Sequence, residues 1–247
     1  MEILTITVLK GGVAKTTTAA ILAQAAAHRG RRVLAIDLDS QGNLSQALAV
    51  RANNGAQNSY RLLTGEVPAR ETIVRSAQGL DVIPASQNLV TITSGRGSAR
   101  RLRQALGPIR NDYDFIFIDT PTAGELQYNA LMASTGIIIP LQVDTYNIQS
   151  LYQITDVVKQ IQKSNPALEI KGAVITKYEG NTNYAKQMRA ALEANAAEMG
   201  IPVLGAIRKG IVVQEAAGLQ KSLYKYAKRS TPAVDYLAVY DQLDRNQ

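Results

Sequence analysis

The amino-acid sequence predicts an α/β fold of three layers, in which a mostly parallel, twisted sheet carries helices on both faces. Short apolar, β-branched runs alternate with longer helical patterns from one end of the chain to the other. A glycine turn joins the first run to the first helix, and two later runs end in aspartate, as strands do at the ligand-binding edge of an open parallel sheet. No linker or internal repeat interrupts this alternation, so we expect residues 1–247 to form one domain.

The elements follow from the spacing of apolar residues. Strands are predicted at residues 3–9, 31–39, 80–85, 113–119, 136–141, 170–176 and 201–207. Helices are predicted at residues 18–27, 44–49, 60–64, 99–109, 146–163, 183–199 and from 230 onward. Leu151, Ile154 and Val158 keep one side of the 146–163 helix apolar. The last helix starts with the hydroxyl caps Ser230 and Thr231, followed by proline in its first turn.

The segment from Lys10 to Thr17 combines two lysines, two glycines and two threonines where the first strand meets the first helix. Glycines let backbone N–H groups approach phosphate oxygens, and the helix N-terminus adds its positive dipole end. This context is that of a phosphate-binding loop. We expect Lys15 to contact the β- and γ-phosphates of a nucleotide and the Thr16 hydroxyl to bind Mg²⁺. A glycine turn without a ligand is the alternative.

Carboxylates end two of the predicted strands. Asp37 and Asp39 end the second strand, and Asp119 follows four apolar residues in the fourth. The carboxyl ends of parallel strands meet at one edge of a sheet, where such folds bind ligands. Four apolar residues followed by aspartate form a Walker B pattern, whose carboxylate reaches a Mg²⁺ ion. The alternative is that these aspartates only end their strands.

Composition narrows the class of protein. The net charge of +7 and the pI of about 9.6 favour polyanionic partners, either nucleic acid or an anionic membrane surface. There is no cysteine, which excludes disulfides, thiolate-bound metals and iron–sulfur clusters. No signal peptide is visible, and no apolar run has the roughly 20 residues needed to span a bilayer. We therefore expect a cytoplasmic protein.

Together these motifs resemble the ParA/MinD superfamily of deviant Walker A ATPases, and the resemblance covers essentially the whole chain. Residues 10–17 resemble its K-G-G-V-G-K-T-T signature, with Lys10 as the signature lysine and Ala14 in place of glycine. Residues 37–43 resemble its D-x-D-P-Q-G-N segment and residues 113–122 its Y-D-Y-I-I-I-D-T-P-P segment, with Ser40 and Thr122 each replacing proline. The resemblance implies a P-loop NTPase fold. A positive φ at Ala14 would add strain to the loop.

The resemblance also implies the role of individual residues. Lys10 would reach across a dimer to the partner's phosphates, and Asp39 would orient the attacking water, so the catalytic residues are Lys10, Lys15 and Asp39. Thr16, Asp37 and Asp119 would support Mg²⁺. The implied ATP-binding residues are Lys10, Gly11, Gly12, Val13, Ala14, Lys15, Thr16, Thr17, Lys177 and Arg208.

The activity and partners implied by the resemblance are those of a ParA-type partition ATPase. The expected reaction is hydrolysis of ATP to ADP and phosphate, weak in the protein alone and stimulated by a ParB-like partner protein. ATP and Mg²⁺ would bind first, and two subunits would then form a homodimer that binds double-stranded DNA without sequence preference. The resemblance therefore implies a nucleoid-associated protein with no membrane contact.

A basic segment near the C-terminus is the candidate DNA-binding surface. Residues 208–229 carry six cationic side chains against Glu215 alone, a balance of +5. Contacts to phosphates need only charge, so no base-reading element is required. A solvated, lysine-rich loop is the alternative interpretation. The expected DNA contacts are Lys209, Lys221, Lys225, Lys228 and Arg229.

Other members of the superfamily offer alternative functions. A MinD-like membrane-positioning ATPase is expected to end in a basic amphipathic helix, whereas residues 241–247 are few and acidic. Iron–sulfur relatives need cysteines, and a tyrosine kinase needs a C-terminal tyrosine cluster that the tyrosines here do not form. Another cargo-positioning ATPase, and a switch protein that binds ATP without hydrolysing it, stay open. The sequence identifies neither the cargo nor the partner.

Overall fold

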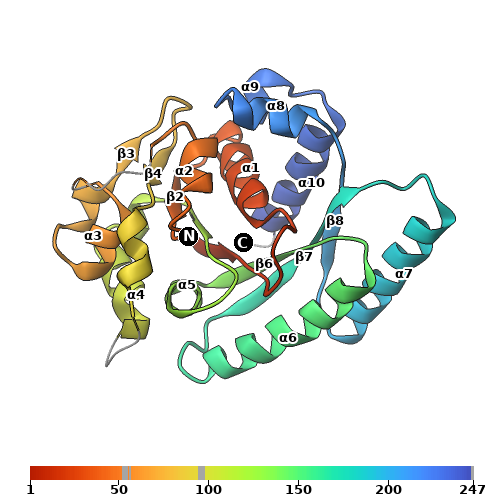
Figure 1. Cartoon of the computed structure of the whole chain (residues 1–247), viewed down its shortest axis with the longest axis horizontal. Coiled ribbons are helices and arrows are strands. Elements are labelled where there is room, and N and C mark those ends of the chain that lie inside the picture. The colour runs from red at the N-terminus through yellow and green to blue at the C-terminus, as the bar shows by residue number, and fades with distance from the viewer. Residues whose placement is uncertain (52–54, 56, 94–97, 246–247) are drawn as a thin grey trace.

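The computed structural model describes residues 1–51, 55, 57–93 and 98–245. Within these residues one eight-stranded sheet has the order β3-β4-β2-β5-β1-β6-β7-β8 (Figure 1). Neighbouring strands are parallel except for β3 and β4, so the predicted mostly parallel sheet is confirmed. The strands are β1 (Glu2–Ile6), β2 (Val33–Asp37), β3 (Val74–Arg75), β4 (Asp81–Ile83), β5 (Phe115–Asp119), β6 (Gly136–Leu141), β7 (Glu169–Tyr178) and β8 (Val203–Arg208).

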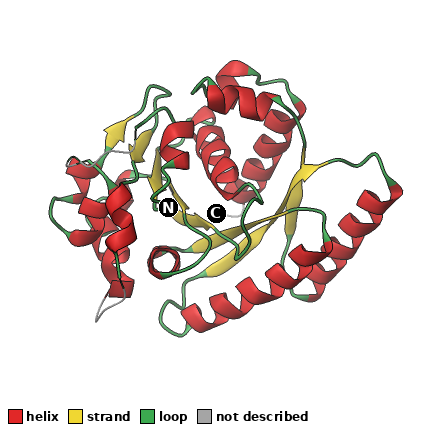
Figure 2. Ribbon diagram, in the orientation of Figure 1, coloured by secondary structure: helices red, strands yellow, loops and turns green. Residues whose placement is uncertain are grey.

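Helices cover both faces of the sheet, which makes the expected three layers (Figure 2). One face carries α1 (Lys15–His28), α2 (Asn43–Ala47), α8 (Val212–Gly218), α9 (Leu223–Tyr226) and α10 (Thr231–Arg245). The other carries α3 (Ser59–Thr64), α4 (Arg101–Leu106), α5 (Glu125–Ala133), α6 (Thr145–Gln162) and α7 (Asn183–Glu198). Short 3₁₀ turns lie at Ala69–Thr72, Gln87–Thr91, Ser98–Arg100 and Arg110–Asp112.

Alternation along the strands divides the core between the two faces. In β1, Leu4 and Ile6 pack in the cluster that contains α1, whereas Ile3 packs in the cluster on the opposite face. Helix α1 turns alanines toward the sheet, including the fully buried Ala19 and Ala23. Small side chains let the helix lie close to the strands, so α1 packs directly against β1 and β5.

Each predicted strand and helix is present in the structure with its ends within three residues, but the described residues also contain β3, α8 and α9, which were not predicted. Strand β3 was not predicted, because a two-residue strand leaves no period in the sequence. The predicted helix at residues 99–109 is shorter, since α4 ends at Leu106 before Gly107 and Pro108. The long helix predicted at 146–163 is α6, displaced by one residue.

The carboxyl ends of three central strands lie side by side. In the sheet register Asp119 of β5 is the partner of Ile6 on β1 and of Asp37 on β2. The loop before α1 leaves the sheet just after Ile6, and Asp39 follows β2 by two residues. Segments that are far apart in the sequence therefore meet at this edge.

Candidate nucleotide-binding site

The loop between β1 and α1 presents a row of free backbone donors. In the part of the chain that the structure describes, no acceptor is bonded to the N–H groups of residues 11–17. These seven consecutive donors include the first turn of α1, whose N–H groups have no partner within the helix. Gly12 has a φ of +79° and Ala14 a φ of +67°, so both adopt the left-handed conformation. Such a loop is suited to bind an anion.

The positive φ of Ala14 therefore adds the strain expected when a residue other than glycine occupies this position. A left-handed residue with a Cβ atom is disfavoured, and Ala14 is one of four such non-glycine residues in the described ranges. The loop closes nevertheless, because alanine has the smallest side chain after glycine. The loop therefore keeps its row of free N–H groups although Ala14 replaces the glycine of the family signature.

Lys15 lies half-buried at the start of α1, and its Nζ donates a hydrogen bond to the Lys10 carbonyl at 3.2 Å. Burial lowers the pKa of Lys15, and the negative charges of Asp119 and Asp39 partly oppose this shift. The ammonium group therefore lies in the field of both carboxylates. A cation beside a row of N–H donors is placed to bind phosphate oxygens.

Asp119 is a carboxylate without a partner. Both of its oxygens are buried and accept no hydrogen bond within the described residues. Burial, followed by the charge of Asp37, raises the pKa of Asp119 to about 8, while the neighbouring Thr16 hydroxyl partly opposes the rise. An orphaned carboxylate beside a threonine hydroxyl supplies the hard oxygen ligands that Mg²⁺ prefers, with phosphate and water as the others. The residues present fit this ion.

Asp37, which was also expected to support Mg²⁺, is engaged in hydrogen bonds of the fold. Its Oδ1 accepts from the Asp39 N–H at 3.1 Å, and its Oδ2 accepts from the N–H and the hydroxyl of Ser45 at 2.8 and 2.6 Å. Burial raises the pKa of Asp37 to about 6, against these hydrogen bonds. The observed role of Asp37 is to fix the turn that carries Asp39 and the start of α2.

A cavity of about 670 Å³ opens beside the loop. Its wall contains Asp39 and residues 120–122, which follow β5, together with parts of α1, α2 and α8. This volume is within the range of small-molecule sites. Six of the predicted loop residues line it, whereas Val13 is buried in the core. The loop residues that line it are Gly11, Gly12, Ala14, Lys15, Thr16 and Thr17.

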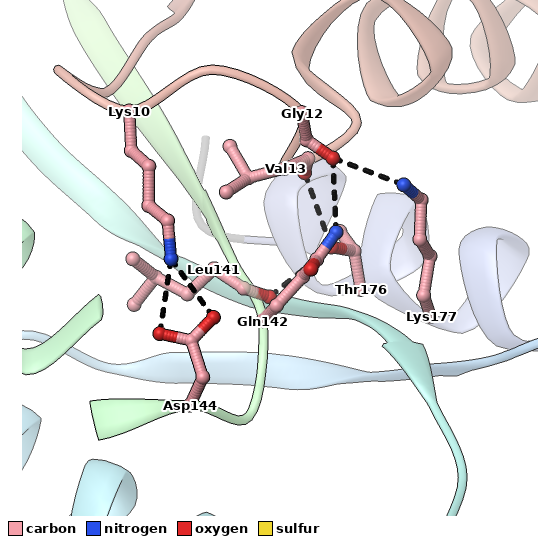
Figure 3. Close-up of polar contacts among 8 residues, drawn as sticks. All are labelled: Lys10, Gly12, Val13, Leu141, Gln142, Asp144, Thr176 and Lys177. Carbon is pink, nitrogen blue, oxygen red and sulfur yellow. Dashed lines mark hydrogen bonds and ion pairs between the residues drawn. The ribbon is translucent and has the colours of Figure 1, made fainter. Parts of the chain in front are cut away.

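The two distant residues assigned to ATP differ in their positions. Lys177 lines the cavity, and its Nζ donates to the Gly12 carbonyl at 2.9 Å (Figure 3). Arg208 does not line the cavity, and its guanidinium forms a two-point ion pair with Asp235 at 2.7 and 3.0 Å. The structure therefore brings Lys177 to the site and holds Arg208 outside its wall.

Figure 3 shows that Lys10 points away from the loop toward Asp144. Its Nζ lies 2.8 and 3.0 Å from the two carboxylate oxygens. Neither Asp144 nor Gln142 was predicted from the sequence to belong to the site. Gln142 donates a hydrogen bond to the Gly12 carbonyl at 2.9 Å. Asp144 and Gln142 both follow β6, and polar residues after a parallel strand at this sheet edge were the signal available for finding them.

The basic segment lies partly at the cavity and partly at the surface. Lys221 lines the cavity, whereas Lys225, Lys228 and Arg229 are exposed in and after α9. These four cations form no ion pair within the described residues. Lys209 pairs with Glu179 at 3.1 Å.

The described residues contain no cluster of three or more His, Cys, Asp or Glu side chains that could hold a metal ion. They also contain no helix that is long and apolar enough to cross a bilayer. A parallel sheet whose first strand leads through a row of free N–H groups and a lysine into a helix, with an orphaned aspartate on the adjacent strand, defines a P-loop nucleoside triphosphatase.

Comparisons with known proteins narrow this class. A family model described as an AAA domain matches residues 1–170. The chromosome-partitioning ATPase Soj of Thermus thermophilus is 34% identical, over 95% of this chain and 92% of that protein. The chromosome partitioning protein ParA of Caulobacter vibrioides is also 34% identical, over 96% and 91%. The chain thus belongs to the ParA/Soj family of the ParA/MinD superfamily of ATPases.

A solved structure supports the fold over its full length. Cobyrinic acid a,c-diamide synthase from Mycobacterium smegmatis superimposes with a TM-score of 0.86 and 29% identity, covering 100% of this chain and 95% of that one. That protein was solved with bound ADP and magnesium, and also with an ATP analogue and magnesium. An adenine nucleotide with Mg²⁺ is the ligand expected from the sequence.

Proposed function

We propose that this chain is a single-domain partition ATPase that binds ATP and Mg²⁺ at the loop between β1 and α1. The observation that carries the proposal is the row of seven N–H groups without acceptors, residues 11–17, beside the Lys15 ammonium. The nucleotides and magnesium in the Mycobacterium smegmatis structures support this choice of ligand. The triphosphate is placed on the N–H groups by its charge, and the nucleoside lies in the adjoining cavity.

Each polar group of the site has a distinct task in hydrolysis. Thr16 and Asp119 hold Mg²⁺, which neutralises charge on the phosphates. Lys15 stabilises the negative charge that develops on the transferred phosphoryl group. Asp39, at the cavity wall, orients the attacking water. Positioning and charge account for catalysis of this kind. The resemblance to partition ATPases implies a low rate in the isolated protein.

The larger cycle follows that of the relatives. Two subunits form a homodimer with ATP between them, and Lys10 of each reaches the phosphates of the other. Lys221, Lys225, Lys228 and Arg229 then bind the phosphates of double-stranded DNA, and a ParB-like protein stimulates hydrolysis and release. The names of the two partitioning relatives support a role in moving DNA. The exposed, unpaired lysines support contact with a polyanion.

Nucleotide binding tests the core of the proposal. The Lys15→Ala variant removes the cation beside the loop, and we expect ATP affinity by calorimetry to fall at least tenfold and hydrolysis to be lost. The Lys186→Ala variant, which removes an exposed lysine on α7, is the matched control and keeps both. Equal ATP affinity in the Lys15→Ala variant and the unmodified chain would refute the site.

A further inference from the structure

Two successive carbonyl groups of the loop are held by side chains from the ends of β6 and β7 (Figure 3). The Gly12 carbonyl accepts hydrogen bonds from Gln142 Nε2 and Lys177 Nζ, each at 2.9 Å. The Val13 carbonyl accepts from the Thr176 hydroxyl at 3.1 Å, and the same hydroxyl lies 3.1 Å from the Leu141 carbonyl. We call Gln142, Thr176 and Lys177 the carbonyl clamp.

The clamp sets the direction of the N–H groups that follow. A trans peptide points its carbonyl and the next N–H in opposite directions, and the described chain has no cis peptide bond. Carbonyls of Gly12 and Val13 that face the clamp therefore turn the N–H groups of Val13 and Ala14 away from it. These are two of the seven N–H groups without acceptors. By holding the Gly12 and Val13 carbonyls, the clamp thus fixes the direction of the N–H groups in the same two peptide units.

This chain has a particular need for such support. Ala14 stands where the family signature has glycine, and it has a φ of +67° that residues with a Cβ atom rarely adopt. A loop with that strain relaxes unless its surroundings hold it. We propose that Gln142, Thr176 and Lys177 are positioning residues, which keep the loop in its anion-binding conformation before the nucleotide arrives. This inference rests on the proposed nucleotide-binding function.

The three members of the clamp act differently on a ligand. Lys177 lines the cavity, so it has a second way of affecting a nucleotide. Gln142 and Thr176 do not line the cavity, and Thr176 is buried. Any effect of these two residues on binding must therefore pass through the loop, which makes them the informative positions for mutation.

The test measures the affinity of Gln142→Ala and Thr176→Val for ATP, ADP and pyrophosphate by calorimetry. Because the clamp acts on the phosphate donors, all three ligands should bind about 3- to 10-fold more weakly, the effect of losing one hydrogen bond. Thr176→Ser restores the hydroxyl and should restore the affinity. The control is Gln149→Ala, which removes an exposed glutamine on α6. Pyrophosphate has no base or sugar, so a weakening confined to ATP and ADP would overturn the proposal.

A second readout does not depend on the ligand. In the ligand-free Gln142→Ala variant, the ¹⁵N order parameters of the Val13 and Ala14 amides should fall, while those of β1 stay unchanged. Unchanged order parameters and unchanged affinities in this surface variant would refute the clamp, even if Thr176→Val fails to fold. If the unmodified chain bound no nucleotide, the proposed function would fail, and the order parameters would still decide whether the clamp holds the loop.

Discussion

Lys10 and Asp144 form a two-point ion pair within one subunit, with Nζ 2.8 and 3.0 Å from the carboxylate oxygens. The side chains are 30% and 35% exposed, so solvent screens the pair. If Lys10 reaches the phosphates of the partner subunit in an ATP-bound dimer, it must first leave Asp144. Each of the two subunits breaks one such pair, so the pairs together oppose dimerisation by about 0.4–2 kcal/mol, twice the value typical of a single exposed pair.

The Asp144→Asn variant should therefore dimerise more readily. We expect its ATP-bound dimer to form at a protein concentration up to about 30-fold lower than that of the unmodified chain, because two pairs are lost per dimer. Sedimentation velocity over a range of concentrations measures this difference. The Asp156→Asn variant, which neutralises an exposed aspartate on α6, is the control. Weaker dimerisation of Asp144→Asn would mean that Asp144 instead supports Lys10 in the dimer.

Asp119 predicts a pH dependence of stability in the absence of ligand. Its pKa in the folded chain is raised to about 8, above the usual value of 3.8 in the unfolded chain, because of burial and then the charge of Asp37. Its contribution to stability is therefore full below about pH 4 and is lost as the pH rises through about 8. Asp119→Asn removes this loss, so the variant should melt at a higher temperature than the unmodified chain at pH 8.

Thermal melts at pH 5 and pH 8 check this prediction. At pH 5 the folded carboxyl is protonated, and the two proteins should melt at similar temperatures. In the Asp119→Asn variant, Mg²⁺ should no longer add to the increase in melting temperature that ATP gives the protein, because the proposed metal ligand is removed. If the variant and the unmodified chain differ in melting temperature by the same amount at pH 5 and pH 8, Asp119 is not the group with the raised pKa.

Ala14 predicts a stabilising substitution. Its left-handed backbone costs about 1–2 kcal/mol with a Cβ atom present, whereas glycine adds about 0.4–1 kcal/mol of unfolded-state entropy. Ala14→Gly should thus change the free energy of unfolding by about 0 to +1.5 kcal/mol, as measured by urea denaturation. Ala194→Gly, at an exposed position within α7, should instead destabilise the chain by about 1 kcal/mol. Equal losses in the two variants would show that Ala14 is not strained.

Replacing Asp39 should separate the binding of ATP from its hydrolysis. Asp39 lies at the cavity wall, and one of its oxygens accepts from the Gln41 N–H at 3.0 Å. Asp39→Ala should bind ATP and accumulate as a dimer, while the hydrolysis rate falls by about 10²-fold or more, the typical contribution of a positioned base. Single-turnover measurements compare it with Asp156→Ala. Hydrolysis at the unmodified rate would leave Asp39 only a structural role.

DNA binding by the basic segment is tested through salt. If a dimer neutralises about six phosphates, log K should fall with log salt at a slope near −5. Replacing Lys225, Lys228 and Arg229 with alanine should flatten the slope and leave ATP binding intact, because none of the three lines the cavity. Replacing Lys159, Lys163 and Lys186 removes the same charge from exposed positions on and near α6 and α7 and should not change the slope. Equal affinity for DNA in the presence of ADP and of ATP would show that DNA binding does not depend on the bound nucleotide.

The sequence by itself determined the sheet and the loop. Apolar periodicity located seven of the eight strands, because buried parallel strands are apolar on both faces. The spacing of Lys10, Lys15 and Thr16 around two glycines located the phosphate-binding loop, since strand, turn and helix are local in the chain. A local motif contains the residues that build it, so no distant contact was needed to find it.

Only the tertiary structure decided which distant side chains act on that loop. Gln142, Asp144 and Thr176 lie more than a hundred residues from it, and the parallel order of β1, β6 and β7 brings them to its edge. The structure also divided the strand-ending aspartates, giving Asp37 the hydrogen bonds of Ser45 and leaving Asp119 without a partner. Spacing in a sequence cannot reveal this difference, because the hydrogen bonds that a buried carboxylate receives depend on segments folded against it.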